Sequence, residues 1–264
     1  MPQFAANLSM MFTELPFLER FAAAKRSFKG VEYLSPYEYP AEDLASELRR
    51  CELENVLFNL PAGNWAAGER GIACIPGRED EFRAGVSLAI SYAQRLNTKR
   101  LHAMAGIVPP HARSAGVHAT YISNLQYAAA ETAKHGITLL IEAINLRDIP
   151  GFYLSTQAQA YAVLEEVGAP NLKMQMDLYH MQVTEGDLAI KLRKYAPHCG
   201  HVQIAGAPER REPDTGEIRY SYLFDLLDEI GYTGWVGCEY KPAGKTVDGL
   251  GWLRERSRAV QECS

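Results

Sequence analysis

The chain has 264 residues, of which 47% are hydrophobic and 22% are charged, and its formal net charge is −5. This composition is typical of a globular enzyme and excludes an extended, charge-rich disordered protein. The negative charge also gives no electrostatic reason to expect nucleic acid or an anionic membrane as a partner.

Along the chain, short β-type runs alternate with longer helical patterns, which is typical of parallel βα units. We expect strands near residues 3–8, 31–34, 53–59, 100–105, 137–142, 172–177, 200–204 and 235–239. We expect helices near residues 15–27, 41–51, 79–96, 116–135, 156–167, 185–195, 220–230 and 247–260. Eight of each predict a single (β/α)₈ TIM barrel domain over residues 1–264. The alternative is a doubly wound open sheet, which needs no eighth strand.

Two long segments, at residues 60–78 and 205–219, are expected to be loops. Each follows a predicted strand, so both should lie at the C-terminal face of the barrel, where enzymes of this fold carry their active sites. Long loops in a compact barrel usually have a function.

The cysteines are far apart, and no two of them form a C-x-x-C pair. They are Cys51, Cys74, Cys199, Cys238 and Cys263. An odd number of separated cysteines in a long chain predicts reduced thiols. Neither a secretory leader nor a run long enough to span a membrane is visible, so we expect a cytoplasmic protein.

Four polar residues close four successive apolar runs in the second half of the chain. They are Glu142, Asp177, Gln203 and Glu239. At the ends of the last four barrel strands they would meet at one face and supply only oxygen ligands, the preference of Mg²⁺ or Mn²⁺. We expect Glu142 and Glu239 to face each other across the barrel mouth and to move protons on a substrate held between them. The competing interpretation of a single strand-end glutamate is a helix cap or an arginine partner.

His180 follows Asp177 by three residues, where it could bond a substrate oxygen that becomes charged during the reaction. A structural or capping histidine is the alternative. His201 lies on the same face of its strand as Gln203, one layer deeper, and fits a supporting role as well as a catalytic one.

Arg70 lies in the 60–78 loop and could bind a substrate carboxylate as part of a lid. The alternative is an arginine that ties the loop to the barrel. Lys241, two residues beyond Glu239, and Arg210 are second choices for the same contact. No G-x-G-x-x-G pattern follows a strand, so the sequence does not support a nicotinamide site.

Several longer segments carry a resemblance. They read FAANLSMMFTELPFLERF (4–21), NLPAGNWAAGERGIACIPGREDEFR (59–83), DIPGF (148–152), DLYHMQ (177–182), EPDTGEI (212–218) and GWVGCEYKP (234–242). With these segments the chain resembles the hydroxypyruvate isomerase family, within the xylose-isomerase-like (β/α)₈ barrels. The relatives include isomerases of 2-oxo-tetronate, and the motifs do not separate the two substrates.

The resemblance implies that Glu142 and Glu239 act as proton donor and acceptor. It also implies that the four strand-end residues hold a divalent ion where one is bound, and that the partner is a small keto acid. For hydroxypyruvate the product would be 2-hydroxy-3-oxopropanoate (tartronate semialdehyde), formed through a cis-enediol(ate). Whether the chain forms a homo-oligomer stays open.

Three positions differ from the expected pattern: Phe58, Ala143 and Gly206. They lie beside the predicted pocket, where a three-carbon and a four-carbon acid would be distinguished. The alternatives are therefore a 2-oxo-tetronate isomerase, a ketose 3-epimerase and, more remotely, a metal-dependent phosphodiesterase or endonuclease. A non-enzymatic binding protein on the same barrel is the last option.

Overall fold

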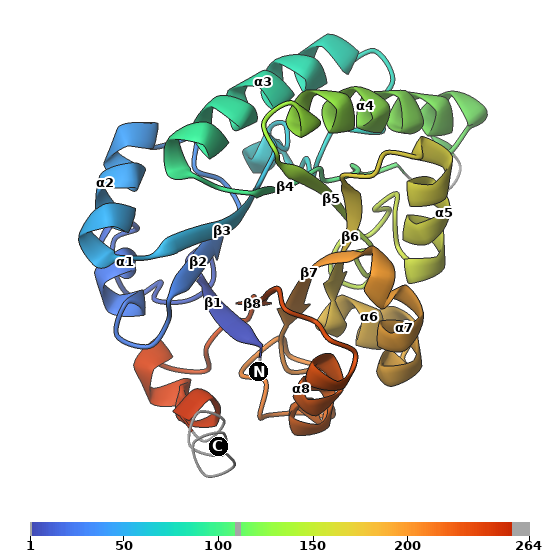
Figure 1. Ribbon diagram of the computed structural model, residues 1–264. Coiled ribbons are helices and arrows are strands. Elements are labelled where there is room, and N and C mark those ends of the chain that lie inside the picture. Colours follow the sequence, from blue (N-terminus) through green and yellow to red (C-terminus); the bar gives the residue numbers. More distant parts are fainter. Residues whose placement is uncertain (1, 109–111, 255–264) are drawn as a thin grey trace.

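A computed structural model describes residues 2–108 and 112–254 of the chain (Figure 1). Eight parallel strands close a barrel in chain order, with β1 paired to β8, which confirms the predicted TIM barrel and excludes the open sheet. The strands are β1 (Gln3–Asn7), β2 (Gly30–Tyr33), β3 (Glu54–Asn59), β4 (Arg100–His102), β5 (Thr138–Glu142), β6 (Leu172–Asp177), β7 (Cys199–Ile204) and β8 (Trp235–Cys238).

Helices surround this barrel on the outside (Figure 1). They are α1 (Glu19–Ala24), α2 (Ala41–Cys51), α3 (Glu79–Leu96), α4 (Ala115–Ala133), α5 (Gln157–Val167), α6 (Leu178–Thr184), α7 (Leu188–Tyr195) and α8 (Tyr220–Glu229). The amphipathic pattern explains their packing: all six apolar residues that recur at helical spacing in α3 are buried. None of the helices in the described part of the chain is long and apolar enough to cross a membrane.

Two helix predictions need correction. The sequence predicts no helix between residues 177 and 185, but α6 begins directly at Leu178, because the Asp177 side chain accepts hydrogen bonds from the first backbone N–H groups of the helix. The predicted helix 185–195 corresponds to α7 (Leu188–Tyr195), which is the second helix after β6. The predicted helix 247–260 begins with a 3₁₀ turn, Thr246–Gly249, and its residues 255–260 lie outside the described part.

The barrel interior is layered. A small apolar cluster fills its lower part and consists of Ala5, Val56, Leu57, Leu140 and Trp235. Side chains two residues apart on a strand point to the same face. The interior positions nearer the C-terminal ends of the strands are occupied by polar residues. Gly237 is needed at this level, since a Cβ there would overlap the carboxylate of Glu32 on β2. Polar side chains therefore lie at the barrel mouth, above the apolar cluster.

Both long loops lie on the C-terminal side, as predicted, because they follow β3 and β7. The 60–78 loop contains a 3₁₀ turn, Trp65–Ala67, and an ion pair between Glu69 and Arg78. In the 205–219 loop, Arg210 adopts a left-handed backbone conformation, with φ of 57°. The four cysteines of the described part are free thiols, as expected.

Candidate active site

The four strand-end residues meet at the barrel mouth. Glu142 and Asp177 are the last residues of β5 and β6, Gln203 is the penultimate residue of β7, and Glu239 follows β8 directly. Their exposed fractions are 5%, 0%, 1% and 6%. Four polar side chains are thus held in a nearly dry environment, where their electrostatic interactions are strong.

Two amide side chains connect the two glutamates. Gln175 Nε2 donates to Glu142 Oε2 at 3.0 Å and to Gln203 Oε1 at 2.7 Å. Gln203 Nε2 in turn donates a short hydrogen bond to Glu239 Oε2. The glutamates are therefore fixed relative to each other through Gln175 and Gln203, although they come from different strands.

The predicted opposition of the glutamates is only partly correct. Strands β5 and β8 are separated by β6 and β7, so they lie three steps apart in a ring of eight. Glu142 and Glu239 consequently approach the centre of the mouth from one half of the barrel, and Asp177 on β6 lies between them.

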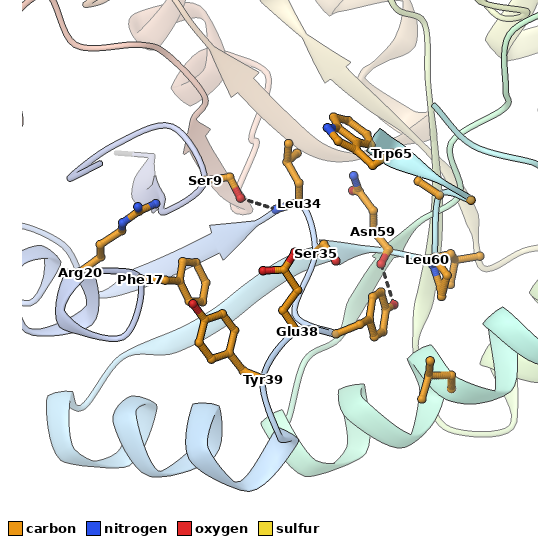
Figure 2. A pocket seen from close by; sticks show the side chains of 15 residues that line it. Ser9, Phe17, Arg20, Leu34, Ser35, Glu38, Tyr39, Asn59, Leu60 and Trp65 are labelled. Carbon is orange, nitrogen blue, oxygen red and sulfur yellow. Dashed lines mark hydrogen bonds between the residues drawn. The ribbon is translucent and has the colours of Figure 1, made fainter. Parts of the chain in front are cut away.

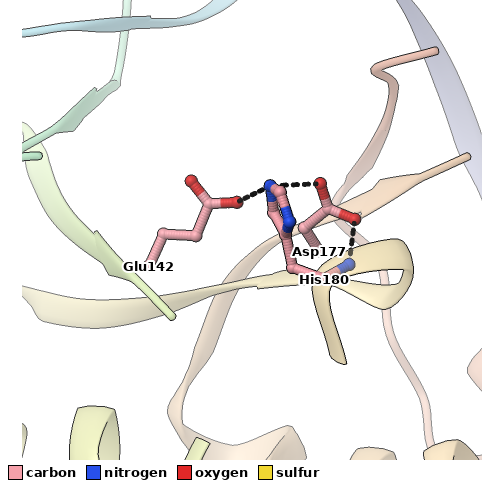
Figure 3. A group of neighbouring side chains, drawn as sticks. All are labelled: Glu142, Asp177 and His180. Carbon is pink, nitrogen blue, oxygen red and sulfur yellow. Dashed lines mark hydrogen bonds and ion pairs between the residues drawn. The ribbon is translucent and has the colours of Figure 1, made fainter. Parts of the chain in front are cut away.

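A candidate metal-binding group consists of Glu142, Asp177 and His180, whose ligand atoms lie within 4.8 Å of one another. His180 Nε2 is 3.8 Å from Glu142 Oε1 and 3.6 Å from Asp177 Oδ2 (Figure 3). Glu142 Oε1 is buried and has no hydrogen-bond partner among residues 2–108 and 112–254. An unsatisfied buried carboxylate oxygen is expensive, which suits a site that a cation or a substrate completes.

Arg210 lies among the same carboxylates. Its Nη2 is 2.7 Å from Glu239 Oε1 and 3.4 Å from Asp177 Oδ2, and its Nη1 is 3.7 Å from Asp148. The guanidinium also lies over the ring of Tyr179, 5.0 Å from its centroid. Arg210 therefore supplies the positive charge that balances Asp177 and Glu239.

A further buried carboxylate, that of Glu32, lies below the four strand-end residues. Glu32 on β2 is 1% exposed, and its carboxylate binds His201 Nε2 at 2.7 Å and Gln203 Nε2 at 2.8 Å. Asn7 donates to the same carboxylate at 3.1 Å. His201 and Gln203 bind the same carboxylate of Glu32. His201 therefore has the supporting role, one of the two roles that its sequence position allowed.

Burial shifts the ionisation of the carboxyl groups. It raises the pKa of Glu142 well above its usual value, and the nearby Glu239 and Asp177 raise it further. Burial also raises the pKa of Glu239, to about 8, although Arg210 opposes this shift. Among the described residues, the Glu239 carboxylate has a cation and an amide as hydrogen-bond partners, whereas Glu142 has only an amide.

Two buried histidines flank Glu142. Burial lowers the pKa of His180 well below its usual value, and Arg210 lowers it further. Burial and the neighbouring His201 lower the pKa of His102 to about 3. Both rings are therefore neutral at physiological pH.

Two residues that the sequence suggested for binding a substrate carboxylate make no side-chain contact with this cluster in the described part of the chain. Arg70 stacks on Trp65, 3.8 Å from the ring centroid, and donates to backbone oxygens of its own loop. Lys241 is exposed. The structure instead brings Arg210, a second choice from sequence, into the cluster.

A cleft of about 680 Å³ opens beside the mouth, on the side of β1 to β3 (Figure 2). Its lining includes Ser9, Leu34 and Ser35 from the segments after β1 and β2, and Asn59 and Leu60 at the end of β3. The Asn59 side chain also bonds His102 Nδ1 at 3.1 Å, so it forms a wall shared by the cleft and the carboxylate cluster.

Several residues of this site were not predicted from the sequence. Glu32 is a charged residue inside a four-residue apolar strand, and Gln175 precedes Asp177 by two positions, so it shares that residue's face. An analysis of the alternating positions along each strand would have identified both Glu32 and Gln175. Asn145 and Asp148 lie in a loop after β5, and no periodic pattern points to them.

Known proteins share this sequence and this architecture. A 2-oxo-tetronate isomerase from Cupriavidus necator is 52% identical over 255 residues, which cover 96% of this chain and 98% of the relative. A hydroxypyruvate isomerase from Escherichia coli is also 52% identical, over 254 residues and the same shares of both chains. A crystal structure described as an AP endonuclease of family 2 from Brucella melitensis has a TM-score of 0.95 and 50% identity, covering 97% of this chain and 99% of that one.

A model of the xylose isomerase-like TIM barrel family matches residues 21–256. The two named enzymes are isomerases, as the sequence predicted for this chain. The chain therefore belongs to the xylose isomerase-like TIM barrel family, in the branch that contains hydroxypyruvate and 2-oxo-tetronate isomerases.

Proposed function

We propose that this chain interconverts a small 2-keto-3-hydroxy acid and its 2-hydroxy-3-oxo isomer. The observation that carries the proposal is the pair of buried glutamates, Glu142 and Glu239, linked through two amides around Asp177 and His180. Two carboxyl groups with different environments suit a reaction in which one removes a proton from carbon and the other returns one to the neighbouring carbon.

The donor set fits a divalent metal ion, because Glu142 Oε1 has no partner and Asp177 lies beside it. We propose Mg²⁺ or Mn²⁺, which prefer carboxylate oxygens. Such an ion would polarise the adjacent carbonyl and hydroxyl oxygens of the substrate. Gln203 and Glu239, the other two predicted ligands, bond Gln175 and Arg210 here, so they would join the ion only after these contacts change.

The environments of the glutamates support a division of roles. Glu239 has Arg210 as an ionic partner, which favours its carboxylate form, so we propose that it removes the C3 proton. In the described part of the chain Glu142 has no cationic partner within hydrogen-bond distance, and we propose that it carries the proton that is given to C2. The O3 proton moves to O2, which leaves a carbonyl at C3 and an alcohol at C2. This carbonyl is an aldehyde if the substrate is hydroxypyruvate and a ketone if it is 2-oxo-tetronate. His180 donates a hydrogen bond to the oxygen that becomes charged.

The substrate is proposed to be hydroxypyruvate or 2-oxo-tetronate, because relatives of both names are 52% identical to this chain. Arg210 is the cationic side chain of the described cluster nearest to the glutamates, and we propose it, rather than Arg70, as the contact for the substrate carboxylate. Both acids have a carboxylate at C1, a carbonyl at C2 and a hydroxyl at C3, and only C2 and C3 react, so the chemistry of the glutamates is the same for either.

A ketose 3-epimerase is the second candidate reaction. It needs the same two carboxyl groups but returns the proton to the carbon from which it came. Solved 3-epimerases share the fold at about 20% identity, which supports the architecture alone. An endonuclease is not favoured, because the chain carries a net charge of −5 and lacks the basic surface composition that a DNA groove requires.

The test is to incubate the protein with each acid in D₂O, with Mn²⁺ or with a chelator, and to follow the products by NMR. We expect isomerised product with deuterium at C2. Deuterium exchange without isomerisation of either acid, together with turnover of a ketose, would favour the epimerase. No turnover of hydroxypyruvate or 2-oxo-tetronate under any condition would exclude the proposed function.

A further inference from the structure

The loop after β5 contains a hydrogen-bonded chain that ends at His180. Asn145, which is 1% exposed, accepts a hydrogen bond on Oδ1 from the backbone N–H of Asp148 at 2.8 Å. Its Nδ2 lies 2.6 Å from His180 Nδ1. The orientation of the Asn145 amide is set by the first contact, because a backbone N–H can only donate and Nδ2 can only donate as well.

This orientation determines the tautomer of the imidazole. Since Asn145 Nδ2 donates, His180 Nδ1 must be the unprotonated nitrogen, and the proton of the neutral ring must lie on Nε2. Nε2 faces the space between Glu142 Oε1 and Asp177 Oδ2, at 3.8 and 3.6 Å. His180 therefore presents an N–H group, not a lone pair, to the centre of the site.

His102, on the other side of Glu142, provides an internal contrast. Its Nδ1 lies 3.1 Å from Asn59 Oδ1, an atom that can only accept, so here Nδ1 carries the proton and Nε2 does not. His102 Nε2 is accordingly buried without a hydrogen-bond partner among the described residues. Two asparagines with opposite amide orientations thus hold two neutral histidines in opposite tautomers on either side of one glutamate.

We infer that Asn145 is a positioning residue that fixes His180 as a neutral Nε2–H donor for the charged oxygen of the reaction intermediate. A donor that is neutral and already oriented stabilises developing negative charge without reorganising during the step. A nitrogen that carries a proton cannot also bind a metal ion, so the cation in this site is left to the carboxylate oxygens. The catalytic part of this inference rests on the proposed function, but the tautomer does not.

The test uses Asn145→Asp. The new side chain still accepts from Asp148, but its second oxygen can only accept from His180 Nδ1, which moves the ring proton to Nδ1 and leaves Nε2 bare. In protein labelled with ¹⁵N-histidine, long-range ¹H–¹⁵N spectra should show a protonated Nε2 in the original chain and a protonated Nδ1 in the variant. A His180→Asn variant identifies the His180 signals among those of the 7 histidines.

Asn59→Asp is the matched control, because it adds the same charge beside a histidine at the same rim. Both Asn59 Oδ1 and an aspartate oxygen accept from His102 Nδ1, so neither histidine should change its tautomer. If Asn145→Asp does not fold, Asn145→Ala removes the donor, and His180 should then show a mixture of tautomers.

For activity we expect Asn145→Asp to lower kcat by about 10²-fold, the effect of losing one preorganised donor, with little change in KM. A protonated His180 Nδ1 in the original chain overturns the inference whatever the activity. A reversed tautomer with unchanged kcat overturns the positioning role. Absence of turnover in the original chain contradicts the proposed function instead and leaves the tautomer result intact.

Discussion

The C-terminal ends of β5 and β8 carry the same residue type, yet Glu142 and Glu239 have different surroundings. Glu239 is bonded to Arg210 and Gln203, so both of its oxygens have partners. Within the part of the chain that the structure describes, Glu142 is bonded only to Gln175, and its Oε1 has no partner. One carboxyl group is balanced by a cation, and the other is left for a proton or a metal ion. Position in the fold brings each glutamate to the mouth, but its neighbours decide what it can do there.

The largest effect we expect comes from removing either carboxyl group. Glu142→Gln and Glu239→Gln should each lower kcat by roughly 10²–10⁴-fold, because each loses one general acid–base step. The two variants should differ in D₂O: Glu142→Gln should still exchange the C3 protons of the substrate, and Glu239→Gln should not. Equal exchange in both variants, measured by NMR, would contradict the assignment of Glu239 as the base. Circular dichroism checks that the fold is intact.

Removal of the Arg210 guanidinium should make the surroundings of Glu142 and Glu239 more alike. Arg210→Met leaves Glu239 without its ionic partner, so its pKa should rise further above about 8. Because the base must be ionised, the rise of kcat/KM with pH should move to higher pH, and the rate at pH 7 should fall by about 10-fold per pKa unit. Arg210→Lys keeps the charge and should show a smaller displacement. An unchanged pH profile in Arg210→Met would show that this arginine does not act on Glu239.

Metal binding should depend more on Glu142 than on Glu239. At Mn²⁺ concentrations 100 times Kd the ion stabilises the fold by about 2.7 kcal/mol, which raises Tm by roughly 5–10 °C in a chain of this size. A chelator should reverse this. Glu142→Gln should lose most of the increase, and Glu239→Gln should keep more of it, since Glu239 is engaged by Arg210. Calorimetric scans measure the difference, and the opposite order would contradict the proposed ligand set.

The last difference between the two glutamates concerns the stability of the metal-free protein. The folded-state pKa of Glu239 is about 8, above its value of roughly 4 in an unfolded chain. The folded state therefore binds more protons, and this contribution to stability is complete below pH of about 4 and is lost as pH rises toward 8. Glu239→Gln lacks this titration, so its denaturation free energy should fall less steeply over that range than that of the original chain. Parallel curves in urea titrations would exclude a raised pKa.

Much of the architecture was predictable because it depends on local patterns. The alternation of short apolar runs with helical segments is repeated along the chain, and it predicted the closed barrel that the structure shows. The positions of Glu142, Asp177 and Gln203 at strand ends followed from the same pattern. Helix α6 is the exception, because it depends on an N-terminal cap. Asp177 both caps this helix and lies at the barrel mouth.

The sequence by itself determined the eight-strand order and the set of carboxylates at one face, since strand period and burial are properties of neighbouring residues. Only the tertiary structure decided their partners. Arg210 reaches Glu239 through a loop with a left-handed turn, Glu32 meets Gln203 across 171 positions of the chain, and the direction of the Asn145 amide depends on a single backbone N–H. Such contacts depend on where loops end in space and on which atoms can donate or accept, and these properties have no periodic signature in the sequence.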